Sequence, residues 1–247
     1  MLPPLNLGKR MQKQEQIVEM FNQIAPSYDK ANRILSFGVD ISWRKKACER
    51  VLKCFDEHKK LKIVDVACGT GDMLEIWQAK AKELHKSISS LIGIDPSTSM
   101  LKIAKKRFSK LEFIEAKAQE LPLKDKSANI ISIGYGIRNV VQRKEALKEF
   151  FRVLDRGGIL LILEFTKREK SGLVAWIRDF YLKYILPKIG SLISKNAQAY
   201  EYLPHSIDVF LSKEELIAEL EETDFKMMYY ESLSFGISSM FVATKEK

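Results

Sequence analysis

The sequence predicts an α/β domain whose central sheet is mostly parallel and is covered by helices on both faces. Short, β-branched apolar runs alternate with helical segments along most of the 247 residues. The runs are apolar on both faces, as in strands that are buried between two layers of helices. The length suits one such domain with insertions, so we expect a single domain over residues 1–247.

Five strands are expected in the first two thirds of this domain. They occupy residues 62–67, 91–95, 111–116, 129–136 and 159–165. Helices are expected between them at residues 73–86, 97–108 and 144–154, and the last of these should stop at the pair Gly157-Gly158. Strands that alternate with helices in this way are typical of a parallel sheet.

The C-terminal part predicts a helix followed by an antiparallel strand pair. Ser212 and Glu215 have the spacing of a capping box, in which each side chain accepts a hydrogen bond from the other residue's backbone amide. The helix should run to about Thr223, and residues 225–233 and 238–244 should form two strands joined through Gly236. With this pair at its edge, the sheet has seven strands.

Two segments fall outside the alternation of strands and helices. Residues 15–55 are expected to be helical in two pieces, broken near Pro26 and Gly38, and to form a lid. Within this segment Tyr28 and Asp29 either close over a bound ligand or, in the case of Tyr28, pack the helices against the sheet. Residues 167–211 are expected to form a helical insertion on the substrate side.

Composition restricts the compartment and the partners. No run approaches the roughly 18 uncharged apolar residues of a membrane span, and residues 1–10 lack the apolar stretch of a signal peptide, so we expect a cytoplasmic protein. Cys48, Cys54 and Cys68 do not have metal-ligand spacing, and we expect no metal site. The net charge of +9 indicates either an anionic partner or surface, or a basic protein without an electrostatic partner.

The segment after the first strand has the pattern of a nucleotide-binding turn. Ligands of a doubly wound sheet bind beyond the carboxyl ends of the strands, and Gly69 and Gly71 let the backbone turn tightly at that place. Asp95 ends the second strand, where its carboxylate can accept hydrogen bonds from both hydroxyls of an adenosine ribose. A glycine turn without any ligand is the alternative, and it leaves Asp95 unexplained.

Details of this turn favour S-adenosylmethionine over a dinucleotide. A dinucleotide needs the pattern G-x-G-x-x-G, but Leu74 occupies the third glycine position. Asp72 stands at the start of the next helix, where its charge would repel a pyrophosphate. S-adenosylmethionine carries an ammonium and a sulfonium instead of phosphates, and Asp65 and Asp72 suit those cations.

Motifs along most of the chain resemble one known family. They are Tyr28-Asp29, Asn32, Ser36-Phe37-Gly38, Trp43-Arg44, Gly69-Thr70-Gly71-Asp72, Gly136-Ile137-Arg138-Asn139-Val140, Arg152-Val153-Leu154, Gly157-Gly158, Leu161-Ile162-Leu163-Glu164-Phe165, Leu186-Pro187-Lys188-Ile189-Gly190 and Tyr202-Leu203-Pro204. Together, over about residues 21–231, they resemble the C-methyltransferases of ubiquinone and menaquinone biosynthesis.

This resemblance implies a class I S-adenosylmethionine-dependent methyltransferase with a Rossmann-like seven-stranded sheet. It implies methylation of a ring carbon of demethylmenaquinol to give menaquinol, with a 2-methoxy-6-polyprenyl-benzoquinol as a further substrate. Methylation of another small molecule or of RNA stays open as the alternative. Cofactor contacts are implied at Thr70, Asp95, Lys117, Ala118 and Gly134. Two of these depart from the family pattern, because Lys117 replaces an acidic or amide residue and Gly134 often corresponds to Ser.

The chemistry requires a ring hydroxyl to lose its proton, because a phenol-type pKa near 10 leaves little phenolate at neutral pH. We hypothesise that Arg138 stabilises the developing oxyanion and that Asn139 orients the ring oxygen. Alternatively, Arg138 pairs with a nearby carboxylate as a strut of the loop. His205 is a candidate general base by its pKa range, although a lone histidine is more often a surface residue.

The partners expected are a polyprenylated quinol and a membrane surface. Residues 173–186 have the pattern of an aromatic, amphipathic helix, which could line a channel for an isoprenoid tail or rest on a bilayer. Flanking Lys and Arg residues favour peripheral association with the inner leaflet of the cell membrane. A core helix or a homodimer interface is the alternative. We expect no nucleic-acid partner, because the sequence has no basic and aromatic RNA-binding platform.

Overall fold

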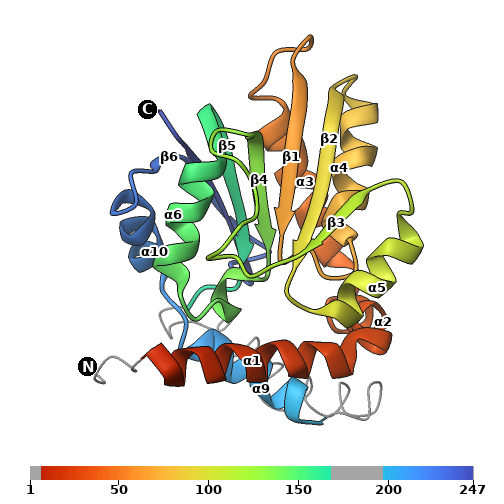
Figure 1. Cartoon of the computed structure of the whole chain (residues 1–247), viewed down its shortest axis with the longest axis vertical. Coiled ribbons are helices and arrows are strands. Elements are labelled where there is room, and N and C mark those ends of the chain that lie inside the picture. Colours follow the sequence, from red (N-terminus) through yellow and green to blue (C-terminus); the bar gives the residue numbers. More distant parts are fainter. Residues whose placement is uncertain (1–6, 168–196, 247) are drawn as a thin grey trace.

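The computed structural model describes residues 7–167 and 197–246, which form a sheet with helices on both faces (Figure 1). The seven strands are β1 (Lys60–Val66), β2 (Ser87–Asp95), β3 (Glu112–Glu115), β4 (Ala128–Gly134), β5 (Leu154–Glu164), β6 (Lys226–Leu233) and β7 (Ser238–Thr244). Their order across the sheet is β3-β2-β1-β4-β5-β7-β6. Strands β1 to β5 pair in parallel, and β7 runs antiparallel to both β5 and β6. The predicted fold class is confirmed.

The described helices fall into two groups. Those that follow the strands are α4 (Asp72–Glu83), α5 (Thr98–Arg107), the 3-10 turn η2 (Ile137–Asn139), α6 (Arg143–Val153) and α10 (Lys213–Glu221). The N-terminal group is α1 (Leu7–Ile24), the 3-10 turn η1 (Ala25–Ser27), α2 (Tyr28–Leu35) and α3 (Val39–Leu52), and α9 (Ala197–Asp208) precedes α10. The predicted capping box at Ser212 and Glu215 is present, with both hydrogen bonds formed.

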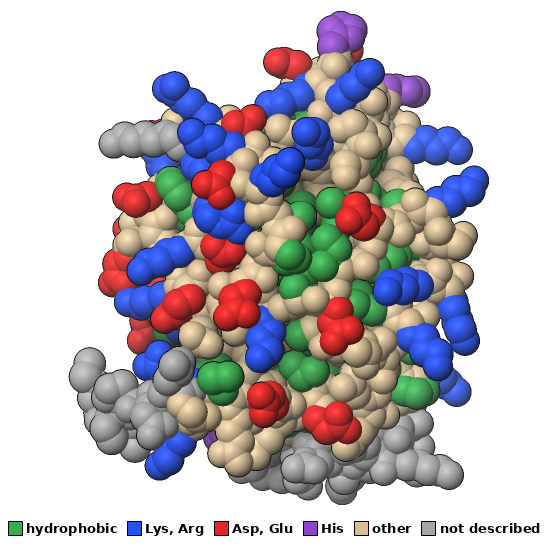
Figure 2. Space-filling view, in the orientation of Figure 1, with side chains coloured by type: hydrophobic (Ala, Val, Ile, Leu, Met, Phe, Trp, Pro, Cys, Tyr) green, Lys and Arg blue, Asp and Glu red, His purple; other side chains and the backbone are tan. Residues whose placement is uncertain are grey.

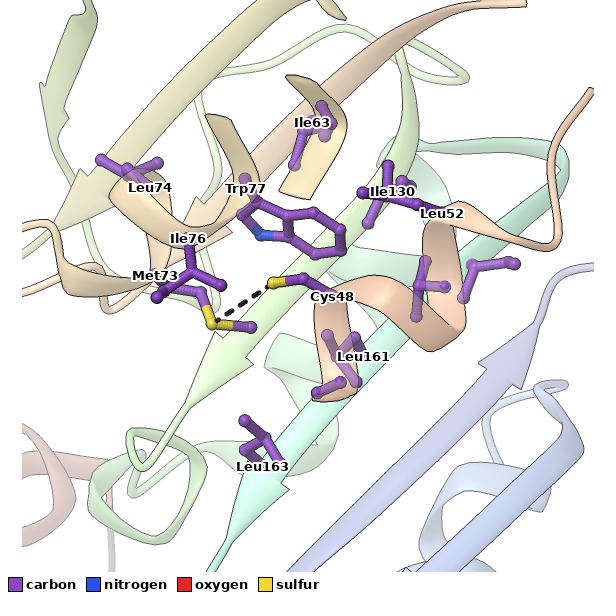
Figure 3. Close-up of a cluster of buried hydrophobic side chains, with 14 of the residues drawn as sticks. Cys48, Leu52, Ile63, Met73, Leu74, Ile76, Trp77, Ile130, Leu161 and Leu163 are labelled. Atoms are coloured by element: carbon purple, nitrogen blue, oxygen red, sulfur yellow. Dashed lines mark hydrogen bonds between the residues drawn. The ribbon is translucent and has the colours of Figure 1, made fainter. Parts of the chain in front are cut away.

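Successive residues of the central strands point to opposite faces and so build two separate cores. Ile63 of β1 pairs with Ile130 of β4, and both lie in the core under α3 and α4 that includes Trp77 (Figure 3). The next pair along, Val64 and Ile131, lies in the core under α6 and α10. Because helices bury both faces of the sheet, successive side chains of these strands must be apolar. This burial explains the continuous apolar pattern of the strands.

Element boundaries differ from the prediction in two places. Strand β5 begins at Leu154 and passes through Gly157 and Gly158, so this pair lies inside the strand and does not stop the preceding helix. A bulge absorbs the extra residues, since Ala128 of β4 pairs with Leu154 but Ile130 pairs with Ile159. The predicted stop was therefore wrong, because the left-handed conformation of Gly157, at φ +71°, serves the bulge.

The N-terminal segment differs from the prediction in its extent. Helix begins at Leu7, not near residue 15, and the two breaks separate three helices. Pro26 lies in η1, and Gly38, at φ +74°, caps the start of α3. Helix α1 crosses the sheet at the carboxyl ends of β1, β2 and β4, which point toward it (Figure 1). Of the insertion over residues 167–211, α9 is described, whereas residues 173–186 lie outside the described part of the chain.

Candidate active site

The turn between β1 and α4 is built from residues in the left-handed conformation. Ala67, Gly69 and Gly71 have φ angles of +52°, +56° and +96°. At Gly71 a Cβ atom would lie 2.7 Å from the ring of Phe108, so glycine is needed there for space as well as for conformation. The amide of Cys68 donates to the carbonyl of Ile94 at 3.0 Å, which ties the turn to the end of β2.

A cavity lies between this turn, the carboxyl ends of the strands and helix α1. This is the edge of the sheet at which ligands of doubly wound folds bind. Of the predicted site residues, Gly69, Asp95, Lys117, Ala118, Gly134 and Asn139 line it. The structure therefore brings together residues from four separate loops, as expected for ligands that bind at the carboxyl edge of such a sheet.

Asp95 is the buried carboxylate of the cavity wall. Its Oδ2 accepts from the backbone amide of Gly69 and its Oδ1 from that of Ser97, both at 2.8 Å. Burial raises the pKa of Asp95 to about 6, although these two amide donors oppose the shift. Each carboxylate oxygen retains lone pairs after these bonds, so Asp95 can still accept from ligand hydroxyls.

Asp65 lies beneath the turn and does not line the cavity. It pairs in register with Ser132 of β4, whose hydroxyl donates to Asp65 Oδ1 at 2.6 Å, and Trp77 Nε1 donates to the same hydroxyl at 3.0 Å. Burial raises the pKa of Asp65 to about 7, against the hydrogen bond from Ser132. The Asp65 side chain is thus fixed by Ser132 beside Trp77, in the core under α3 and α4.

Asp72 begins α4 and is surrounded by arginines, outside the cavity wall. Arg33 of α2 bridges the carboxylates of Asp72 and Asp40, and Arg107 of α5 contacts Asp72 at 3.0 Å. Burial alone would raise the pKa of Asp72, but Arg44, Arg33 and Arg107 outweigh it and hold the pKa below its ordinary value. This negative charge is therefore neutralised by the protein itself.

Thr70 and Asp29 connect the turn to the predicted lid. The hydroxyl of Thr70 donates to the carboxylate of Asp29, and the guanidinium of Arg107 donates to the Thr70 carbonyl at 3.0 Å. Neighbouring Tyr28 lines the cavity and packs in the apolar cluster that includes Ile24 and Met100, while its closure over a ligand stays a prediction. Burial raises the pKa of Tyr28 above its ordinary value.

Arg138 and Asn139 follow β4 but face different surroundings. Arg138 Nη1 lies 2.5 Å from Oε1 of Glu164, which is fully buried, and donates to the carbonyl of Tyr135 at 2.9 Å. This is the geometry of the strut. Asn139 lines the cavity, and the hydroxyl of Tyr202 donates to its Oδ1 at 3.0 Å.

His205 lies on the exposed side of α9 and does not line the cavity. Its neighbour Ser206 is buried and lies 3.3 Å from Arg138 Nε. Within the described part of the chain, no group of three or more His, Cys, Asp and Glu side chains has an arrangement suited to a metal ion.

Sequence inspection missed the cavity wall that α1 supplies. Gln14, Ile17, Val18 and Phe21 all line the cavity, and the first of these precedes the predicted start of the lid. Their spacing of three, four and seven residues places them on one face of a helix, which is the signal that could have found them. Asn22, on the same helix, accepts from the hydroxyl of Ser97 at 2.7 Å and anchors α1 beside Asp95.

Comparison with known proteins decides the family. A family model described as the ubiE/COQ5 methyltransferase family matches residues 9–245. The chain belongs to this family. A Campylobacter jejuni protein named ubiquinone/menaquinone biosynthesis C-methyltransferase UbiE is 64% identical over 95% of this chain and all of the relative. A Thermotoga maritima demethylmenaquinone methyltransferase is 37% identical over 91% of this chain and 94% of the relative.

Solved structures with the same fold include methyltransferases of lower sequence identity. A Haloferax volcanii methyltransferase in complex with the Trm112 activator has a TM-score of 0.63 at 16% identity and covers 92% of this chain and 98% of its own. A Thermotoga maritima SAM-dependent methyltransferase has a TM-score of 0.57 at 21% identity, over 93% and 99% of the two chains. These likenesses place the methyltransferase described here in the class I fold.

The strut geometry predicts that Arg138 stabilises this methyltransferase through Glu164. Arg138→Met should lower the free energy of unfolding by about 3–5 kcal/mol, because it leaves a buried carboxylate unpaired. The double variant with Glu164→Gln should recover part of this loss, since glutamine is neutral. Urea unfolding measures the free energy of unfolding of the single and the double variant. Lys144→Met, which breaks the exposed pair with Glu222, is the control and should leave the free energy of unfolding nearly unchanged, because solvent screens such a pair. Unchanged stability in Arg138→Met, combined with lost turnover, would favour the oxyanion role instead.

Proposed function

We propose that this protein transfers the methyl group of S-adenosylmethionine to a ring carbon of demethylmenaquinol and so forms menaquinol. The observation that carries the proposal is the 64% identity, along the full length of the relative, to a C-methyltransferase named for ubiquinone and menaquinone biosynthesis. That name covers two quinone classes, so we include a 2-methoxy-6-polyprenyl-benzoquinol as a second acceptor. The Thermotoga maritima relative is named for demethylmenaquinone alone, which favours the naphthoquinol as the main substrate.

The cavity suits the nucleoside part of S-adenosylmethionine. Asp95 can accept from both ribose hydroxyls, and Lys117 and Ala118 follow β3, beside the expected place of the base. Gly134, around which a Cβ atom would find open space, leaves room where donor and acceptor meet. We assign Asp65, Thr70, Gly71 and Asp72 to shaping the turn, because their side chains or backbone bond within the protein.

When bound, the cofactor supplies an electrophilic methyl group on a positively charged sulfur. The protein must hold the acceptor carbon in line with that methyl group and favour the phenolate form of the ring. Asn139 is suited to this task. With its Oδ1 occupied by the hydroxyl of Tyr202, its amide N–H groups remain to donate to the ring oxygen. The exposed His205 has no place in this arrangement, and Arg138 supports the turn that carries Asn139.

We further propose that the protein works in the cytoplasm, at the inner leaflet of the cell membrane, where a polyprenylated acceptor resides. No helix in residues 7–167 or 197–246 is long and apolar enough to cross a bilayer. On the face drawn in Figure 2, basic side chains alternate with acidic ones, which limits its attraction for an anionic surface. Exposed apolar side chains occur at Val39, which starts α3, and at Ile237 beside β7. Trp43 donates to Ser234 at 2.9 Å, so these two elements adjoin and supply the proposed contact.

A methyl-transfer assay tests the proposed reaction. The purified protein, supplied with methyl-labelled S-adenosylmethionine and a reduced short-chain demethylmenaquinol, should place the label on a ring carbon. Asp95→Ala should lose most of this activity, because the ribose loses its acceptor. Reduced benzoquinol and bulk RNA serve as competing acceptors. Label on RNA alone, or on a quinol oxygen, would contradict the proposal.

The raised pKa of Asp95 predicts a pH dependence of nucleoside binding. The ionised carboxylate is the form that accepts two hydroxyls, so affinity for S-adenosylhomocysteine should be constant above pH 7. It should fall as the pH drops through the pKa of about 6, by about tenfold at pH 5. Titration calorimetry at each pH measures the dissociation constant of S-adenosylhomocysteine. Asp95→Asn should bind weakly without this inflection. The same inflection in the variant would assign it to another group, such as Asp65, whose pKa is about 7.

The membrane proposal predicts salt-sensitive binding to anionic vesicles. The protein should sediment with phosphatidylglycerol vesicles at low salt and less so at high salt, because basic residues contribute about 1 kcal/mol each near such a surface. Val39→Asp combined with Ile237→Asp should reduce sedimentation further. No sedimentation at either salt concentration would contradict the membrane proposal. The surface at Val39 and Ile237 would then be assigned to a homodimer interface, and light scattering would detect the dimer.

A further inference from the structure

Gln14 is a buried amide on the wall of the cofactor cavity. It lies on α1, outside all the predicted motifs, and is 8% exposed. The side chain faces the cavity together with Ile17 and Phe21, which are apolar. A polar group in such surroundings requires hydrogen-bond partners, because an unsatisfied buried amide destabilises the fold.

One end of this amide is fixed by the backbone. The N–H of Val141 lies 2.9 Å from Gln14 Oε1. A backbone N–H can only donate, so the atom that faces it must be the carbonyl oxygen and not the amide nitrogen. Among residues 7–167 and 197–246 the recorded hydrogen bond of the Gln14 side chain is the one to Oε1, and no fully buried side-chain nitrogen or oxygen lacks a partner, so Nε2 is accessible from the cavity. Gln14 therefore presents a donor of defined position to the cavity.

The surroundings of Gln14 place this donor at the base end of the nucleoside. With the ribose on Asp95, at the end of β2, a base extends toward the loop after β3, which carries Lys117 and Gln119. Gln119 Nε2 lies 3.5 Å from Gln142 Oε1. The segment that holds Gln14 through Val141 is therefore adjacent to the loop after β3.

We propose that Gln14 determines specificity for the purine by donating a hydrogen bond from Nε2 to a ring nitrogen. This inference rests on the proposed use of S-adenosylmethionine. A purine offers acceptors at N1, N3 and N7, whereas the exocyclic amine of adenine is a donor. Lys117, the departure from the family pattern, is a donor as well. Gln14 Nε2 and Lys117 Nζ can therefore both donate to ring nitrogens of the purine. Neither nitrogen can accept a hydrogen bond from the exocyclic amine.

Binding of S-adenosylhomocysteine and its 1-deaza, 3-deaza and 7-deaza analogues tests this proposal by calorimetry. The native protein should bind one of the three analogues about 3- to 10-fold more weakly than the parent compound, because one hydrogen bond is lost. Gln14→Glu keeps an oxygen for Val141 but replaces the donor with an acceptor. This variant should bind the parent compound at least about tenfold more weakly and should no longer discriminate against that analogue.

Gln16→Glu is the matched control, since Gln16 is exposed on the same helix and receives the same change of charge. Its affinity should stay within about twofold of the native value. Equal binding of all three analogues by the native protein would overturn the proposal, whether or not Gln14→Glu folds. Equal affinity of Gln14→Glu and native protein for the parent compound would overturn it too. Failure of the native protein to bind S-adenosylhomocysteine at all would instead reject the proposed function.

Discussion

The hydrogen bond between the amide of Gly69 and the carboxylate of Asp95 is the interaction on which the site depends. It joins the turn after β1 to the end of β2. These two segments, which both line the cavity, are therefore fixed relative to each other. The bond is 2.8 Å long, and its acceptor is a carboxylate, which makes it stronger than a hydrogen bond between neutral groups. The left-handed glycines of the turn are needed to bring that amide into position.

The N-terminal helices complete the site by closing it from the side opposite the sheet. Arg33 and Asp29 of α2 bond to the turn at Asp72 and Thr70, so α2 and the turn share one network of polar and charged side chains. The same network leaves Asp72 with little charge to offer a ligand. The carboxylate of Asp72 therefore pairs with arginines of the protein. Its position in the sequence motif does not distinguish this structural role from a contact with the cofactor.

Strand periodicity and turn chemistry were sufficient to predict most of the fold. The double-sided apolar runs identified the parallel strands, and the Ser212 capping box located the last helix, because these signals are local. The bulge at Gly157 was not predictable, since it depends on the register against β4. The cavity wall formed by Gln14 and the pairing of Arg138 with Glu164 also depend on contacts between distant segments. The residues that line the cavity at the ends of β1 to β4 were easier to predict, because strand ends converge in any such sheet.

Helix α1 is fastened over the cavity by neutral amide contacts, at Gln14 to Val141 and at Asn22 to Ser97. Such bonds each contribute only about 1 kcal/mol net, and ionic strength barely affects them. Met20, Phe21 and Ile24 of the same helix pack in an apolar cluster with Met100 of α5, so apolar burial and neutral hydrogen bonds together hold α1 over the cavity. Its attachment should therefore depend little on salt concentration, unlike that of α2, whose Arg33 pairs with Asp72.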